Sequence, residues 1–240
     1  MYDTPETMQY ALDKIIYAEG HYNKEYYDRF YKCTPTLGRY VYDTVSSYFT
    51  LFACSKMVKE IIDHYTSLNM PTYAEYFQNV WNEEWWHYKL LLRDIKNLDL
   101  DFYKLQQILD PTFIARKIFF NRFMGYTASG NPLLFLAPAY IYERSSTSIS
   151  LDYVRRIEHR YGHGDGTNSV TSLLATHCNN EHEKMHLENS LKFMCKLTAA
   201  SKDEILKEVD YLSELMWSGE TQDLYPGEDM MAAIMESCKL

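Results

Sequence analysis

Two Glu-x-x-His units are the residues of this sequence most able to do chemistry. They are Glu84–His87 and Glu183–His186. Residues three apart share one face of a helix, so a carboxylate and an imidazole at this spacing can reach the same metal ion. Glutamate is common in helices and the unit arises by chance, so the face on which each pair lies decides its meaning.

The first unit lies on the apolar face of a predicted helix over 72–97. At about 100° per residue, Glu84 and His87 fall inside the apolar stripe of that helix. Burying an unpaired charge is costly, so both side chains need partners. A metal ion is one such partner. The alternative is that Glu84 pairs with an arginine or a tyrosine and that His87 is a hydrogen-bonded core histidine. The stripe comprises Tyr73, Tyr76, Phe77, Val80, Leu91, Ile95 and Leu98.

The second unit gives the opposite result in a predicted continuous helix over 167–199. There the apolar stripe contains His177 and Glu181, which are spaced four residues apart. Glu183 and His186 fall on the far side. We therefore expect His177 and Glu181 to be buried and Glu183 and His186 to face solvent. This expectation assumes an unbroken helix.

A third carboxylate, Glu143, lies on the inner face of a predicted helix over 132–147. It aligns there with Leu136, Ala139 and Tyr140. An ion pair between Glu143 and an arginine such as Arg144 is the alternative. Three segments thus each bring an inward carboxylate or histidine, and this mixture of oxygen and imidazole ligands suits iron or manganese. The predicted ligands are Glu84, His87, Glu143, His177 and Glu181.

The order and spacing of these residues resemble those of the haem-oxygenase-like diiron oxidases. That family carries a Glu and a His on one core helix, a Glu on a later one, and a His-x-x-x-Asp/Glu-x-x-His set on a third. Here His87 precedes Glu143 by 56 positions, and Glu143 precedes His177 by 34. The likeness covers roughly residues 72–190. The last histidine of the set is replaced by Lys184, which puts the retention of a second iron in doubt.

The resemblance implies a single all-α bundle of the haem-oxygenase-like kind, with about seven to eight helices. It implies two iron ions as cofactors, dioxygen as co-substrate, and oxidation of a small amino- or carboxylate-bearing molecule. One such reaction would convert an aromatic amino acid, for example a tryptophan derivative, to a nitrile. An external electron donor and a homodimer are left open. Aromatic side chains on or near the inner face are candidate walls of the substrate pocket, or simply core packing: Tyr76, Phe77, Trp81, Tyr88 and Tyr140.

Two other interpretations use the same residues differently. A ferritin-like diiron N-oxygenase would use Glu84, His87 and Glu143 together with Glu183 and His186, and would add Glu60 from the preceding helix. A metal-free helical protein would instead use its buried acids to hydrogen-bond a small organic ligand. Substituting His177 or His186 is expected to separate the two metal-binding interpretations.

The elements that must position these residues are helices throughout, because alternating β-branched runs and hairpin turns are scarce. Thr4–Pro5 predicts a helix start, and Thr72 with Glu75 predicts a capping box after Pro71. A glycine-rich stretch over 161–166 predicts a loop. The expected helices span 5–30, 38–68, 72–97, 111–128, 132–147, 149–161, 167–199, 201–218 and 228–237, in one domain over 1–240.

Composition excludes several classes of protein. The net charge is −9, from 24 basic and 33 acidic residues, and no Lys/Arg cluster is present, so nucleic-acid binding is not expected. The nearly apolar run over 132–142 is too short to span a membrane. The five cysteines show no CxxC spacing and are expected to be reduced thiols. The first ten residues lack a basic start and an apolar stretch, so the expected location is the cytoplasm.

Overall fold

The computed structural model describes residues 2–18, 32–163, 168–178, 180–217 and 224–240. Over these residues the secondary structure is helical, and the only β-type pairing is an isolated bridge between Leu100 and Lys239. The all-α prediction is confirmed, although the helices are more numerous than the expected seven to eight. They are α1 (Pro5–Ile16), α3 (Leu37–Ser67), α4 (Pro71–Glu84), α5 (His87–Lys96), α6 (Phe102–Leu109), η1 (Asp110–Thr112), α7 (Ile114–Ala128), η2 (Pro132–Phe135), α8 (Leu136–Ser146), α9 (Leu151–Tyr161), α10 (Ser172–His177), α11 (Asn180–Cys195), α12 (Ala199–Trp217) and α13 (Glu228–Ser237).

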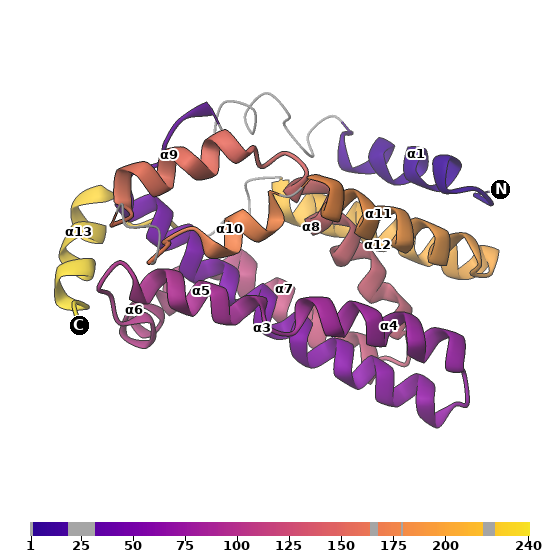
Figure 1. The fold of residues 1–240 in the computed structure, drawn as a ribbon. Helices are drawn as coiled ribbons and strands as arrows, with labels where there is room; N and C mark the ends of the chain where they lie inside the picture. Colours follow the sequence, from indigo (N-terminus) through magenta and orange to yellow (C-terminus); the bar gives the residue numbers. More distant parts are fainter. Residues whose placement is uncertain (1, 19–31, 164–167, 179, 218–223) are drawn as a thin grey trace.

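The long helix α3 organises one side of the molecule, where α4, α5 and α7 pack along it (Figure 1). Helix α1 packs against both α11 and α12 on the other side. Helix α8 joins the two sides, because it contacts α11 and α12 while the short η2 before it contacts α7. The helices that the sequence singled out for chemistry therefore surround the middle of the bundle.

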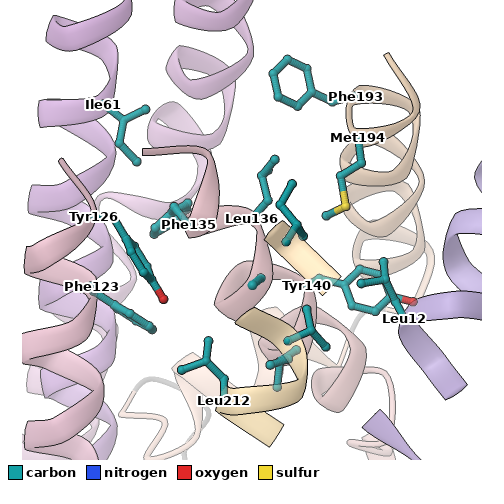
Figure 2. Packing of buried hydrophobic residues seen from close by; sticks show 14 of the residues in the cluster. Leu12, Ile61, Phe123, Tyr126, Phe135, Leu136, Tyr140, Phe193, Met194 and Leu212 are labelled. Atoms are coloured by element: carbon teal, nitrogen blue, oxygen red, sulfur yellow. The ribbon is translucent and has the colours of Figure 1, made fainter. Parts of the chain in front are cut away.

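The main core lies where α3, α7, η2 and α8 meet α1, α11 and α12 (Figure 2). Phe123, Phe135 and Leu136 are almost completely buried there. Burial of such side chains contributes about 1.5–3 kcal/mol each. Polar links cross this core as well: Tyr140 Oη and the Arg144 guanidinium both donate to Asp13, which ties α8 to α1.

Helix boundaries agree with the sequence expectations at most positions. Thr4 caps α1 by accepting the backbone N–H of Thr7, as predicted. The predicted capping box at Thr72 is wrong, because Pro71 already occupies the first turn of α4 and Met70 is its N-cap residue. Helix α6 was not anticipated. The expected 5–30 helix is too long, because α1 ends at Ile16 and residues 17–18 are no longer helical. Its residues 19–30, and 164–166 of the expected glycine-rich loop, lie outside the described residues.

Two of the predicted helices are interrupted where the chemistry was expected. The helix over 72–97 is divided at Trp85–Trp86 into α4 and α5. The helix over 167–199 is divided after His177, where α10 ends, and α11 begins at Asn180. A break in a helix changes the direction of every side chain that follows it, so the buried face of each shorter helix differs from that of the predicted continuous one.

In the described part of the chain, no helix has both the length and the apolarity needed to cross a membrane. The five cysteines are free thiols, as expected.

Candidate metal centre

Glu84, His87 and His177 come together in the middle of the bundle. Each offers a ligand atom, and these atoms all lie within 4.8 Å of one another. His87 Nδ1 is 2.6 Å from Glu84 Oε2, and the rings of His87 and His177 meet edge to face with centroids 4.8 Å apart. Three side chains expected to be ligands are thus adjacent, although they come from segments about ninety positions apart in the sequence.

The helix ends place these side chains. Glu84 is the last residue of α4 and His87 the first of α5, so the short turn between them turns both side chains toward one point. His177 is the last residue of α10, which packs on α5. The start of α10 is fastened by buried Asp94 of α5, whose carboxylate accepts the backbone N–H groups of Ser172 and Leu173 at 2.9 Å each. Asp94 therefore fixes where His177 lies relative to His87.

Helix α11 adds two further side chains that the sequence expectation placed in solvent. Glu183 and His186 are 2% and 6% exposed, so that expectation is wrong. Glu183 Oε1 lies 3.1 Å from His177 Nδ1. His186 Nδ1 lies 3.8 Å from Glu84 Oε1, and its Nε2 lies 3.0 Å from Glu83 Oε2. The Glu84 carboxylate therefore has one oxygen facing His87 and the other facing His186.

Glu181 does not belong to this cluster. Its side chain is 89% exposed and is ion-paired, among the described residues, with the exposed Lys184 at 3.5 Å. The prediction that Glu181 lies on the buried face is wrong because α10 and α11 are separate helices, so a single helical phase cannot be carried from His177 to Glu181. Within α11 itself, the buried polar residues among those described are Glu183, His186 and Ser190, at helical spacing.

Glu143 of α8 faces the same interior, as the sequence predicted. Arg144 does not pair with it, since that guanidinium binds Asp13. The polar contact of Glu143 is with Ser190 Oγ, 3.5 Å from Oε2, and Ser190 Oγ is 3.0 Å from Tyr76 Oη. Burial and the negative charges of Glu84 and Glu183 raise the pKa of Glu143 well above its usual value.

In this cluster, carboxylates and histidines shift each other's pKa values. Burial alone would raise the pKa of Glu84, but His87, His177 and His186 outweigh it, so that the pKa is lowered. Burial alone would lower the pKa of His177, but the hydrogen bond with Glu183 and the charge of Glu84 raise it. Over the described residues, no lysine or arginine pairs with Glu84, Glu143 or Glu183.

A buried nitrogen in this cluster lacks a hydrogen bond. His87 Nδ1 has no hydrogen-bond partner even though Glu84 Oε2 is 2.6 Å away, because the contact lacks hydrogen-bond geometry. Buried polar atoms are nearly always paired, so such an exception needs an explanation. A cation between the two atoms would satisfy both. The residues present therefore fit a metal ion: mixed imidazole and carboxylate donors, an unsatisfied buried nitrogen, and excess negative charge.

Two cavities reach this cluster from different sides. The larger has a volume of about 480 Å³ and the smaller about 360 Å³. Val80, Glu84 and Glu143 line both, so the two cavities adjoin at these three side chains. The larger cavity also touches His177 and Glu183 and has aromatic walls from Phe119, Phe135 and Tyr142. The smaller touches His186 and runs between α4 and α11.

The predicted pocket walls are mostly core residues. Phe77 and Tyr140 are fully buried in the main core, where Phe77 packs against Phe135. Trp81 stacks on Trp85, and Tyr88 packs against Tyr48 and Phe52. None of these four lines either cavity, whereas Tyr76 lines the smaller one. The aromatic side chains that line the larger cavity come instead from α3, α7, η2, α8 and α9.

Comparison with known proteins adds no family: the chain matches no protein-family model, and no curated protein or solved structure is significantly similar to it.

Proposed function

We propose that this chain is a non-haem diiron oxidase or oxygenase that activates dioxygen to oxidise a small organic molecule. One iron would be held by His87 and His177, the other by His186 and Glu143. Glu84 would be shared between the two ions. The observation that carries the proposal is the position of the Glu84 carboxylate, with one oxygen near His87 and the other near His186 and with no lysine or arginine beside it in the described structure.

The chain's own residues have separable tasks in this proposal. Glu183 hydrogen-bonds His177 and orients its ring, as carboxylates beside ligating histidines commonly do. The aromatic walls of the larger cavity exclude water from the reacting molecule. Bound ferrous iron would supply the electrons and the binding position for dioxygen. A lysine at position 184 does not deprive the second ion of a histidine, because His186 faces the cluster instead.

The substrate would occupy the larger cavity. Its volume of about 480 Å³ lies in the range of small-molecule sites. Arg116 lines it and donates to Tyr142 Oη at 3.0 Å, so a guanidinium is present to bind a substrate carboxylate. Aromatic walls with two guanidinium groups, one of which is paired with Asp43, favour an amino- or carboxylate-bearing molecule with a flat or apolar body. Aromatic amino acids, including tryptophan derivatives that would be oxidised to nitriles, are the first substrates to test.

The ferritin-like alternative shares most of these ligands. Glu183 and His186 are buried, as it requires, but its extra ligand Glu60 is exposed and accepts a hydrogen bond from Thr127 at 3.0 Å. Because His177 and His186 both face Glu84, substituting either is now expected to remove metal. The proposed ligand set therefore combines parts of both sequence-based interpretations.

A metal-free binding protein is a second candidate, favoured by one observation. Burial and the neighbouring acids raise the pKa of Glu143 well above its usual value, which favours the neutral carboxyl, and a neutral carboxyl can donate a hydrogen bond to an organic ligand. In that case the two cavities would hold an organic molecule and no ion.

Anaerobic reconstitution with ferrous iron distinguishes the two. We expect the purified chain to bind two irons and the Glu84→Gln variant to bind fewer, with Glu181→Gln as the matched control because it removes the same charge from an exposed position. Oxygen consumption by the loaded protein is then measured with aromatic amino acids, aromatic amines and fatty acids. Iron content below one ion per chain, equal in all three proteins, would reject the oxidase and leave the metal-free protein.

A further inference from the structure

The smaller cavity has a structure that the proposed reaction does not require. It is the gap between α4 and α11, which face each other across the bundle (Figure 1) and are bridged by side chains. Tyr76 of α4 stacks on Phe193 of α11, with ring centroids 3.9 Å apart, and hydrogen-bonds Ser190. At its inner end, this cavity meets Glu84, Glu143 and His186.

One wall of the smaller cavity is a row of oxygen-bearing side chains. Thr72, Glu75, Asn79 and Glu83 all line it, and their spacing of three or four residues places them along one face of α4. Exposure falls along the row: Glu75 is exposed, the Glu83 side chain is 43% exposed and that of Glu84 is 23% exposed. Carboxylates and amides thus lead from the surface to the proposed metal ligands.

The two lysines on the opposite wall, Lys192 and Lys196, do not neutralise the negative charge of this row. Lys192 is paired with Glu188, at 2.6 Å, and Lys196 is exposed at the rim. A hard divalent cation exchanges its water ligands most readily for oxygen ligands, which this row offers in sequence.

The larger cavity offers no comparable path for a cation. Arg116 lines it and would repel a metal ion, whereas the charge of Arg39 is paired with that of Asp43. Its two additional aspartates are engaged, since Asp43 binds Arg39 at 2.9 Å and Asp94 binds backbone N–H groups of α10. Arginines with apolar walls suit an organic anion better than a divalent cation.

We propose that the smaller cavity is the entry route of the metal ions, separate from the larger cavity that receives the organic molecule. This inference rests on the proposed function, because it requires that metal ions bind at Glu84. It adds that ions arrive along the α4 row, past Glu75 and Asn79, and that Val80, Glu84 and Glu143 separate the path of the metal from that of the substrate.

The test follows the rate of Co²⁺ binding to the metal-free protein by stopped-flow visible absorbance. Glu75→Gln removes a charge at the mouth, and Asn79→Trp narrows the passage. For a divalent ion passing within about 10 Å, loss of one charge is expected to slow association about threefold at low ionic strength and less at high salt. Asn79→Trp should also slow association. Both positions are exposed, so the amount of Co²⁺ bound at equilibrium should not change.

Two controls match these variants. Glu181→Gln removes one charge from an exposed site off the route, and Ala139→Phe adds bulk to the larger cavity. Neither should alter the association rate. Slowing by Ala139→Phe, or rates unaffected by Glu75→Gln and Asn79→Trp, would overturn the route while leaving the metal centre in place. Failure of the unsubstituted protein to bind Co²⁺ would overturn the proposed function itself.

Discussion

Asp94 is the residue whose removal most directly tests how the centre is positioned. It is 1% exposed, lies on the same helix as His87, and accepts two backbone N–H groups at the start of α10, the helix that ends in His177. Replacing it with alanine removes the acceptor and leaves two buried donors unsatisfied. We therefore expect Asp94→Ala to destabilise the fold and to displace His177 from His87.

The size of the effect follows from these contacts. Each unsatisfied buried donor costs about 1–3 kcal/mol. Part of this loss is recovered because the variant no longer buries a carboxylate. The pKa of Asp94 is raised, which means that the desolvation of its carboxylate outweighs the hydrogen bonds from the N–H donors. We expect a net loss of about 2–3 kcal/mol, which for a chain of this size lowers Tm by roughly 4–12 °C.

Asp101→Ala is the matched control. Asp101 also accepts two backbone N–H groups at a helix start, from Tyr103 and Lys104 at 3.0 and 3.2 Å, but it is more exposed and caps α6 rather than α10. Loss of an exposed cap costs about 1 kcal/mol. Thermal unfolding followed by circular dichroism compares the two variants, and metal analysis after anaerobic reconstitution reports the centre.

Asp94→Ala should melt at a lower temperature than Asp101→Ala and bind less metal, whereas Asp101→Ala should bind as much as the unsubstituted protein. Equal melting temperatures would refute the energetic argument. A large loss of stability with normal metal content would refute the claim that Asp94 positions His177.

Three further results are expected. Glu143→Gln should stabilise the metal-free protein near neutral pH. Because the pKa of Glu143 is raised above 4.5 in the folded protein, the stability of the unsubstituted protein falls as the pH rises above that value. A difference in Tm between the two proteins that does not shrink toward acidic pH would contradict this. His177→Ala and His186→Ala should each lower the metal content, while Glu181→Gln should not, as metal analysis of the four proteins will decide. Ala139→Phe should weaken substrate binding by filling the larger cavity without changing metal content, and unchanged affinity in calorimetry would place the substrate elsewhere.

The sequence predicted the helical class and the inward positions of Glu84, His87, Glu143 and His177 because each can be judged within its own short segment. The break between α4 and α5 did not affect the prediction for Glu84 and His87, because these residues flank it and both still face the interior. Amphipathic spacing is reliable over such distances.

The predicted positions of Glu181, Glu183 and His186 are wrong because the chain does not keep one helical phase across the end of α10. The signal that could have revealed the break is the Asn179–Asn180 pair, since asparagine is a weak helix former that favours helix ends. The cavity walls were missed for another reason. Side chains such as Phe119 and Tyr142 show their role only once α7 and α8 are packed against α3.

The central claim is that a cation explains the buried acids and histidines around Glu84. The most direct measurement is the stoichiometry of ferrous iron bound under anaerobic conditions, by the unsubstituted protein and by Glu84→Gln. We expect two ions per chain in the first and a marked loss in the second. A protein that binds less than one ion, and in which Glu84→Gln changes nothing, would contradict the claim.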